Sequence, residues 1–272
     1  MAVNIARFHP GLRRWLMSCW AAWKVLSNWT DPLLFGFYLI LRPVATMLIL
    51  MVIVHAVGGG DRERLVFLYV GNAFFLLLVA GANAFEVIHY DRDWHQTIKA
   101  HYLAPGSYML HVLGWASAEL VTGVFSAAVL LTGGLLVLGL PLAVQPASLM
   151  LVLALTTMAV FALSLLLASL ALYASHGAEL VAGGTTGVIY LLSGLLFPPS
   201  ILPTPLRELA QINPMTHLAT LFRASLGLPV VPPDLIGLAF RVTVMLLIAI
   251  HVFRWAFRRA VRTGIIDRRQ NY

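Results

Sequence analysis

The sequence predicts an all-α membrane protein with six membrane-spanning helices. Its residues are 60% hydrophobic and only 11% charged, whereas about a quarter of the residues in a soluble domain are charged. Several apolar runs reach the roughly 20 residues that a helix needs to cross a bilayer. Near the C-terminal third, five prolines interrupt an apolar stretch at 198–226. Broken helices at membrane depth occur only where protein or a water-filled cavity satisfies the backbone, so this stretch predicts a re-entrant helical hairpin.

Residues 1–32 are expected to form an amphipathic helix that precedes the first span. Four basic residues are spread among four tryptophans, and the compact apolar core and cleavage site of a signal peptide are missing. A helix of this composition lies in the headgroup region of a membrane. Asp31-Pro32 then marks a break before the first span.

The hydrophobic runs define six expected spans. They are 33–57, interrupted by Arg42-Pro43, then 65–88, 108–138, 147–173, 180–197 and 235–257. With an even number of spans, the two termini and the loop between the second and third spans share one side, which carries twelve Lys and Arg residues against four opposite. The positive-inside rule places both termini in the cytoplasm. The chain, 1–272, is expected to be a single membrane domain.

The absence of several motifs from the sequence excludes several function classes. No P-loop motif is present, so nucleotide binding through a P-loop is excluded. The single cysteine, Cys19, allows neither an internal disulfide nor a cysteine metal site. The net charge of +7 is concentrated at membrane flanks, which is no sign of nucleic-acid binding. We expect no catalytic residue, no metal and no cofactor in this chain.

Two local patterns leave alternatives open. The cluster of Asp and His residues between spans two and three could hold a metal, but polar residues of a cytoplasmic loop are the better explanation; it comprises His89, Asp91, Asp93, His95 and His101. Gly183 and Gly187 form a Gly-x-x-x-Gly pair that lets helices approach closely, either within this chain or as a dimer contact.

The loop after the second span is expected to carry a short helix at 89–105. Asp91 or Asp93 begins it and Pro105 ends it. Trp94, Ile98 and Tyr102 are four residues apart and form one apolar stripe. Such a stripe outside the membrane needs a surface to pack on, either the headgroup layer or a cytoplasmic partner.

Several motifs then carry a resemblance to a known family. They are Asn28-Trp29-Thr30-Asp31-Pro32, Tyr102-Leu103-Ala104-Pro105, Leu192-Ser193-Gly194-Leu195-Leu196-Phe197-Pro198, Ile212-Asn213-Pro214-Met215-Thr216-His217 and Leu221-Phe222-Arg223. In this order the chain resembles the ABC type-2 permeases, the membrane subunits of ABC exporters of drugs, lipo-oligosaccharides or lipid-linked polysaccharides.

The resemblance implies roles for two regions. The segment 89–105 corresponds to the coupling helix that docks on the ATPase, and its candidate contacts are Glu86, Asp91, Trp94, Ile98, Lys99 and Tyr102. Many members carry a glutamate where this chain has Lys99, so Glu86 is the candidate to supply the acidic group. The hairpin 198–226 corresponds to external re-entrant helices, with gate candidates Phe197, Pro198, Pro199, Asn213, Pro214, His217 and Arg223.

Charged and aromatic residues inside the spans are candidates for a substrate path. Charges there are costly and functional by default. Glu119 either contacts substrate or bonds a neighbouring helix, and Arg42 either binds an anionic headgroup or lies at the interface. Phe74 and Phe75 line the path or pack in the core.

The resemblance implies a permease subunit of an ATP-driven exporter of an amphiphilic or lipid-linked substrate. It would work in the bacterial inner membrane with a second, identical copy, membrane lipids and two copies of a separate ATPase that binds ATP and magnesium. Two other classes stay open. An ion-coupled secondary transporter needs paired acids at mid-membrane, and a lipid-modifying enzyme would have to use the Asp and His cluster at 86–101.

Overall fold

The computed structural model describes residues 10–28, 31–58, 61–84, 86–103, 106–173 and 178–267. Every regular element in these ranges is helical, which confirms the all-α class there. The elements are α1 Pro10–Ser27, α2 Pro32–Gly58, α3 Arg62–Asn83, α4 Glu86–His89, η2 Tyr90–Trp94, α5 Ile98–Leu103, α6 Tyr108–Leu136, α7 Pro146–Ala171, α8 Ala178–Leu192, η3 Pro199–Ile201, α9 Thr204–Ile212, α10 Pro214–Ser225, α11 Leu235–Arg262 and η4 Ile265–Asp267. Parts of two expected segments lie outside the described residues: residues 1–9 and 29–30 of the segment 1–32, and residues 104–105 of the segment 89–105.

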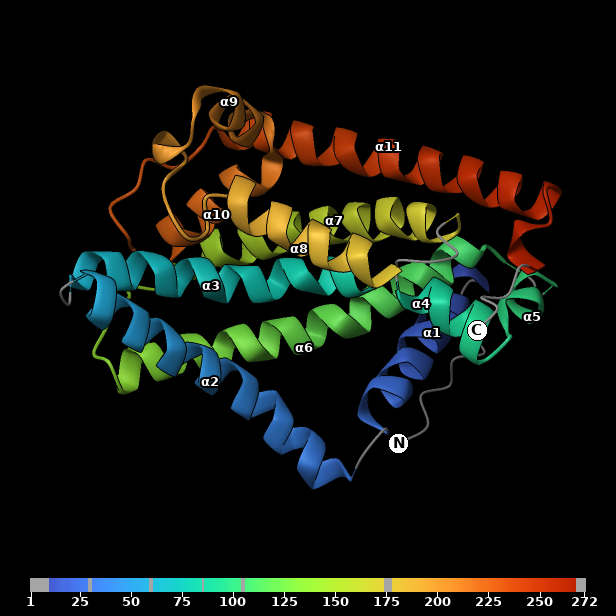
Figure 1. Cartoon of the computed structure of the whole chain (residues 1–272), viewed down its shortest axis with the longest axis horizontal. Coiled ribbons are helices and arrows are strands. Elements are labelled where there is room, and N and C mark those ends of the chain that lie inside the picture. The colour runs from blue at the N-terminus through green and yellow to red at the C-terminus, as the bar shows by residue number, and fades with distance from the viewer. Residues whose placement is uncertain are drawn as a thin grey trace.

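Helix α3 is the core helix of the bundle, lying between α6 and α7 (Figure 1). A Cβ atom at Gly123 of α6 would come within 2.6 Å of the Leu76 carbonyl oxygen, so α6 and α3 touch through their backbones. On the α7 side, the Ser164 hydroxyl donates a hydrogen bond to the Gly81 carbonyl oxygen at 3.1 Å. Small residues and short polar contacts of this kind hold helices together in lipid, where burial of apolar surface does not.

Five helical stretches among the described residues are long and apolar enough to span a membrane. They are Pro32–Ile53, Arg62–Trp94, Tyr108–Leu136, Pro146–Ala171 and Leu235–Arg262. The expected span at 180–197 is wrong in its extent, because α8 ends at Leu192 and Gly194 takes a φ of +62°. The 15 residues of α8 that the structure describes correspond to about 22 Å of helix.

The expected interruption of the first span at Arg42-Pro43 is also wrong. Helix α2 runs through Pro43 without a break. The carbonyl oxygen that Pro43 leaves without an amide partner is that of Leu39, four residues earlier in the helix, and transmembrane helices tolerate such a gap. In Figure 1, α2 leans away from the other long helices, and only 17% of its membrane window is buried within the chain. Its outer face is therefore left for lipid or another protein.

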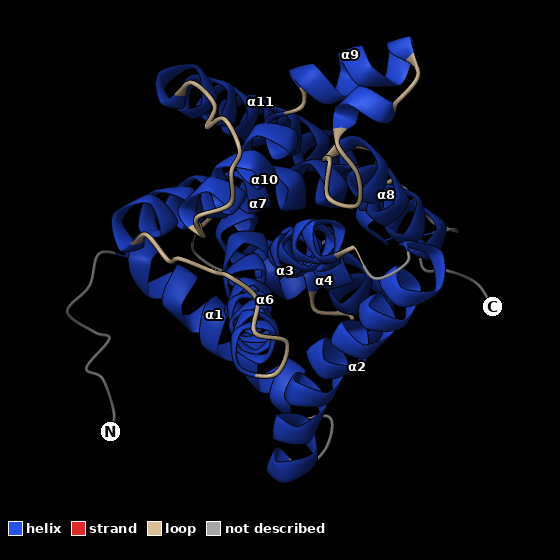
Figure 2. Cartoon of the chain, turned by 90° about the vertical axis from the view of Figure 1, so that its left-hand side faces the viewer, coloured by secondary structure: helices blue, strands red, loops and turns tan. Residues whose placement is uncertain are grey.

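The two regions singled out by sequence lie at opposite ends of the molecule. Helix α9 lies near the start of α11, whereas α5 lies near the other end of the bundle (Figure 1). Figure 2 views the molecule from the α9 end, where α9 sits above the bundle. Helix α1 packs closely on α6, because a Cβ atom at Gly114 would come within 2.5 Å of Ser18. The segment expected at 89–105 and the hairpin expected at 198–226 therefore lie at opposite ends of the bundle, which we call the coupling end and the hairpin end.

Candidate functional site

The segment expected to form one helix at 89–105 is instead built from three pieces. Helix α4 passes into the π-helical η2, which ends where the His95 amide donates to the Tyr90 carbonyl oxygen at 2.7 Å. Gln96 then has a φ of +55°, and α5 begins only at Ile98. A turn with left-handed backbone cannot continue a helix. We call residues 86–103 the coupling segment.

This turn breaks the predicted stripe of Trp94, Ile98 and Tyr102. Trp94 is 66% exposed and Tyr102 is 51% exposed, but Ile98 is buried at 3%. The prediction of Ile98 as a docking residue is therefore wrong, since its side chain belongs to the core. Leu103, at 80% exposed, joins the two aromatic residues instead. The large apolar side chains that are exposed in the coupling segment are thus Trp94, Tyr102 and Leu103.

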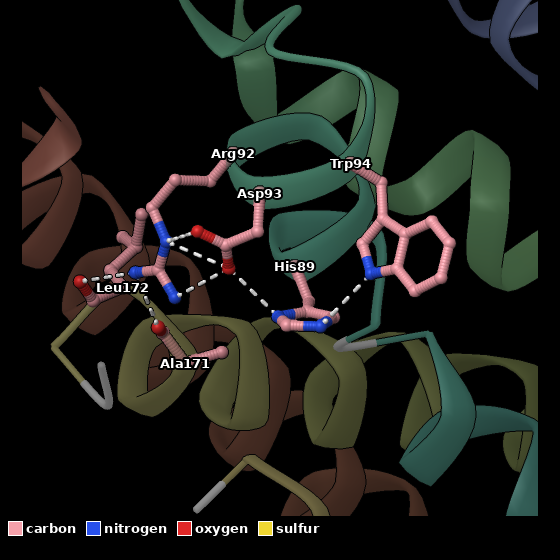
Figure 3. A network of polar contacts seen from close by, with 6 residues as sticks. All are labelled: His89, Arg92, Asp93, Trp94, Ala171 and Leu172. Atoms are coloured by element: carbon pink, nitrogen blue, oxygen red, sulfur yellow. Dashed lines mark hydrogen bonds and ion pairs between the residues drawn. The ribbon is translucent and has the colours of Figure 1, made fainter. Parts of the chain in front are cut away.

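Arg92 ties the coupling segment to α7 (Figure 3). Its side chain is only 4% exposed. Arg92 Nη1 donates to the carbonyl oxygens of Ala171 at 3.3 Å and Leu172 at 3.4 Å. Its Nε and Nη2 donate to the Asp93 carboxylate at 3.3 Å. The last carbonyls of a helix lack partners within it and carry partial negative charge, so a guanidinium there is stabilising. Sequence reasoning missed this residue.

The imidazole of His89 links Asp93 to Trp94 in the same network (Figure 3). The Trp94 indole nitrogen donates to His89 Nε2 at 3.3 Å, and His89 Nδ1 lies 2.8 Å from Asp93 Oδ2. His89 Nδ1 makes no well-directed hydrogen bond within the described residues, so its contact with Asp93 is a close approach of the ring and the carboxylate. The exposed indole is therefore held by the imidazole of His89, a side chain that is 29% exposed.

Asp91 is a buried joint between three elements, and its side chain is not presented to a docking partner. It accepts hydrogen bonds from the Tyr108 hydroxyl at 2.7 Å and the Thr97 hydroxyl at 2.9 Å. His111 Nε2 lies 3.1 Å from one of its oxygens, and His101 Nε2 lies 3.9 Å from the other. Burial lowers the pKa of His101 and the neighbouring His111 lowers it further, with Asp91 opposing them.

A pocket of about 420 Å³ opens beside the coupling segment, among the end of α1 and helices α2, α3 and α6. Arg42, Asn83, Glu86 and Glu119 supply polar groups, and the Asn83 side chain hydrogen-bonds the Glu119 carboxylate. The remaining walls are mainly apolar and aromatic: Val25, Leu26, Phe35, Tyr38, Leu39, Leu76, Val79, Ala80, Tyr90, Trp94, His95, Trp115, Thr122, Gly123 and Ser126. A mostly apolar cavity of this size with a few converging polar groups is typical of a ligand site.

The pocket includes two of the four residues predicted for a substrate path. Arg42 and Glu119 line it, but Phe74 and Phe75 do not. Both phenylalanines are buried, and the Phe74 ring lies 5.1 Å from the Phe222 ring. Phe74 thus packs against α10, and both phenylalanines belong to the buried core. Glu86 lines the pocket rather than the docking surface, and Lys99 is exposed on α5.

Arg223 locks the hairpin end to α3. It is 3% exposed, and its guanidinium donates to the Leu195 carbonyl oxygen at 2.9 Å and the Phe67 carbonyl oxygen at 3.4 Å. The guanidinium also lies 3.7 Å above the Phe67 ring, a cation–π contact. Gly71 makes room for it, since a Cβ atom there would come within 2.6 Å of the guanidinium.

The other hairpin motifs hold the end of α8 against α10. Asn213 caps α10 by accepting from the Met215 amide at 3.1 Å. The Thr216 hydroxyl donates to the Leu192 carbonyl oxygen at 2.7 Å, satisfying a group that the end of α8 would leave open. His217 Nε2 lies 2.7 Å from the Gln211 carbonyl oxygen.

The turn before η3 brings the remaining gate candidates to the same place. The left-handed Gly194 precedes Phe197, Pro198 and Pro199. A Cβ atom at Gly194 would come within 3.1 Å of the Pro199 ring. Pro214 occupies the first turn of α10, where its missing amide costs nothing. The motif residues therefore fix how α8, α9 and α10 meet, and a gating role for them stays a prediction.

Gly183 and Gly187 face outward from the chain. Both are exposed, and a Cβ atom at either would meet nothing within 4 Å among the described residues. Close packing of these glycines within the described chain is therefore not observed. A contact with a second copy stays a prediction.

Comparison with known proteins gives the family. A search of curated proteins found no match. A family model described as ABC-2 type transporter matches residues 16–226, which include the coupling segment, the pocket helices α2, α3 and α6, and the hairpin up to α10. Together with the five apolar helices, the match confirms the resemblance and describes a multi-pass membrane protein. The chain belongs to the ABC-2 type transporter family.

Proposed function

We propose that this chain is the permease of an ABC exporter that moves an amphiphilic or lipid-linked substrate out of the cytoplasm or the inner leaflet. Family membership already makes it a permease subunit, whose ATPase is generally a separate subunit. The substrate class and the outward direction are the proposal. Candidate substrates are a lipo-oligosaccharide, a lipid-linked polysaccharide or a hydrophobic drug.

The pocket beside the coupling segment is the observation that carries the substrate class. Its walls are mainly apolar, while Asn83, Glu86 and Glu119 converge in it with Arg42. Carboxylates and an amide hydrogen-bond hydroxyl-rich headgroups, and apolar walls accept acyl chains or drug rings. Charged groups facing a cavity at membrane depth are functional candidates.

The coupling segment supports an ATP-driven mechanism. Trp94, Tyr102 and Leu103 offer an exposed apolar surface for the ATPase, and Trp94 also lines the pocket. Movement of this surface would therefore reach the pocket directly and reach α7 through Arg92. A ligand shifts such an equilibrium only by binding the inward and outward states differently, so no covalent chemistry is needed in this chain.

Two copies of the chain would complete the transport path. The exposed faces of α2 and of α8, with Gly183 and Gly187, are the surfaces available for the second copy. The hairpin closed by Arg223 would form the gate on the outer side, with both termini in the cytoplasm. Two copies of an ATPase holding ATP and magnesium would bind at the coupling ends.

Reconstitution tests this function. The chain and its ATPase are placed in liposomes, and ATP-dependent movement of a fluorescent lipid-linked oligosaccharide between leaflets is measured. We expect Glu119→Gln to lower the rate of this movement about tenfold. The substitution removes one charged hydrogen bond to the substrate, worth about 1.4 kcal/mol or more, and that energy corresponds to a factor of about ten. Thr243→Val is the matched control, because its hydroxyl is exposed on α11 and bonds only the Ala239 carbonyl oxygen in the structure. No ATP-dependent movement of any amphiphile would contradict the proposal.

One observation supports a second candidate, an ion-coupled transporter. Glu86 and Glu119 line the same pocket and interact electrostatically, so two acids face one cavity, with Glu86 at its coupling-segment end. Liposomes that carry a proton gradient but no ATP separate the two functions. Substrate movement under those conditions would favour ion coupling, and movement only with ATP would favour the ABC mechanism.

A further inference from the structure

Three potential metal ligands converge where the coupling segment meets α6. Asp91 comes from η2, His101 from α5 and His111 from α6, and their ligand atoms all lie within 4.8 Å of one another. We propose that Asp91, His101 and His111 form a binding site for a divalent transition metal ion, best suited to Zn²⁺. The two imidazole nitrogens and one carboxylate oxygen are ligands that zinc prefers.

The distances fit the ligands of one ion. Zinc binds nitrogen and oxygen at about 2.0–2.1 Å in a tetrahedron, which separates neighbouring ligand atoms by about 3.3 Å. His111 Nε2 lies 3.1 Å from Asp91 Oδ2, and His101 Nε2 lies 3.9 Å from Asp91 Oδ1. The two imidazole rings stack with centroids 4.0 Å apart. His101 faces the other oxygen of Asp91, so its side chain, which is 32% exposed, would move toward His111 when one ion binds all three ligands.

His111 provides the second, independent observation. It is 5% exposed, and its Nε2 makes no well-directed hydrogen bond within the described residues although Asp91 is only 3.1 Å away. The carboxylate oxygen therefore lies to one side of the direction in which the ring nitrogen points. Two ligands of one tetrahedral ion have this relation, because their bonds to the metal diverge by about 109°. A direct hydrogen bond would instead place the oxygen in line.

Outer contacts already orient the ligands. His111 Nδ1 lies 3.2 Å from the Ser18 hydroxyl of α1, a contact that leaves Nε2 for a metal when Nδ1 carries the proton. The Asp91 carboxylate accepts hydrogen bonds from Tyr108 and Thr97. Metal-bound histidines and carboxylates almost always have such outer partners.

The site would fasten α5 to η2 and α6. Each ligand belongs to a different element, and an ion shared by them adds its binding energy to the packing of the coupling segment. The Arg14 guanidinium of α1 donates to the His101 carbonyl oxygen at 2.9 Å, which already holds the backbone of α5 in place. Three protein ligands leave a fourth position for water. This inference does not depend on the transported substrate or on ATP.

Zinc binding by the full chain tests the proposal. The chain is purified in mild detergent with a tag free of histidine, stripped with a chelator and reloaded with Zn²⁺. Bound zinc is counted by mass spectrometry, and affinity is measured against a chelating dye. We expect about one zinc per chain. Removal of an outer-shell partner typically lowers metal affinity by roughly 10- to 100-fold, and His101→Ala removes a direct ligand, so its zinc affinity should fall by at least that much. His251→Ala is the matched control, because His251 is exposed on α11 and bonds only its own helix in the structure.

The outcomes separate a metal site from a metal-free polar joint. Zinc should raise the melting temperature of the wild-type chain and of His251→Ala, but not that of His101→Ala. Absence of bound zinc, or equal binding by wild type and His101→Ala, would overturn the proposal. If His101→Ala does not fold, X-ray absorption of the zinc-loaded wild type decides. Two imidazole nitrogens and oxygen ligands at about 2.0–2.1 Å support the site, and any other ligand set overturns it.

Discussion

Replacing Arg92 by methionine is expected to loosen the joint between the coupling segment and α7. Methionine keeps much of the length and apolar stem but none of the donors. The Ala171 and Leu172 carbonyl oxygens would lose their contacts with the guanidinium, and Asp93 would lose a paired charge. Asp93 itself has a side chain only 10% exposed, so its charge would remain in a poorly solvated place.

The cost follows from the geometry of these contacts. Removing one partner of a buried ion pair typically costs about 3–5 kcal/mol, because the other charge stays buried. The contacts of Arg92 are 3.3–3.4 Å long, whereas strong charge-assisted bonds are about 2.7–2.9 Å. We therefore expect the low end of the range, about 3 kcal/mol of unfolding free energy.

Unfolding of the purified chain in mixed micelles with rising SDS measures this cost. A double-mutant cycle of Arg92→Met with Asp93→Asn should give a coupling of about 0.5–3 kcal/mol. The matched control is Arg64→Met on α3. Arg64 forms an ion pair with Asp61, and its side chain is 71% exposed, so this substitution should cost no more than about 1 kcal/mol of unfolding free energy. If Arg92→Met costs no more than Arg64→Met, and the cycle shows no coupling, the reasoning is refuted.

Three further substitutions test the packing of the described helices. Gly71→Ala places a Cβ atom 2.1 Å from the Leu195 carbonyl oxygen, so thermal unfolding should show a loss of at least about 1–3 kcal/mol; an unchanged melting temperature would contradict the close approach. Ile98→Ala removes a side chain that is 3% exposed and should cost about 2–5 kcal/mol, whereas an exposed docking residue would cost little. Asn213→Ala removes the cap on the Met215 amide and should cost about 0.5–2 kcal/mol in SDS unfolding, and no loss would argue against the cap.

The overall helical fold could be predicted because length and hydropathy determine it directly. An apolar run of 20 residues has few alternatives to a helix in lipid. The predicted end of the fifth span was wrong because the sequence stays apolar beyond Leu192. The helix itself ends at Leu192, just before the left-handed Gly194 and the prolines that follow it. The break expected at Arg42-Pro43 was wrong in the opposite direction, because a proline inside a membrane helix removes one backbone hydrogen bond without ending the helix.

The site was less predictable because it depends on contacts between distant segments. Periodicity placed Ile98 with Trp94, but it assumed an unbroken helix and so missed the turn at Gln96. The sequence marked Asp91 and His101 as neighbours in one loop, while His111, ten residues beyond His101, reaches them only when α6 folds back. Arg92 carried a usable signal, a charge next to an apolar span, yet its α7 partners are backbone carbonyls without sequence identity.

Co-purification with the ATPase tests the central claim most directly. The chain is recovered from its native membrane in mild detergent, and associated proteins are identified. We expect a stoichiometric P-loop ATPase with the wild-type chain, and its loss when exposed Trp94 and Tyr102 are changed to aspartate in a chain that still folds. Changing exposed Trp255 of α11 in the same way is the control, and it should keep the ATPase. Recovery of the chain alone with full transport activity would contradict the account.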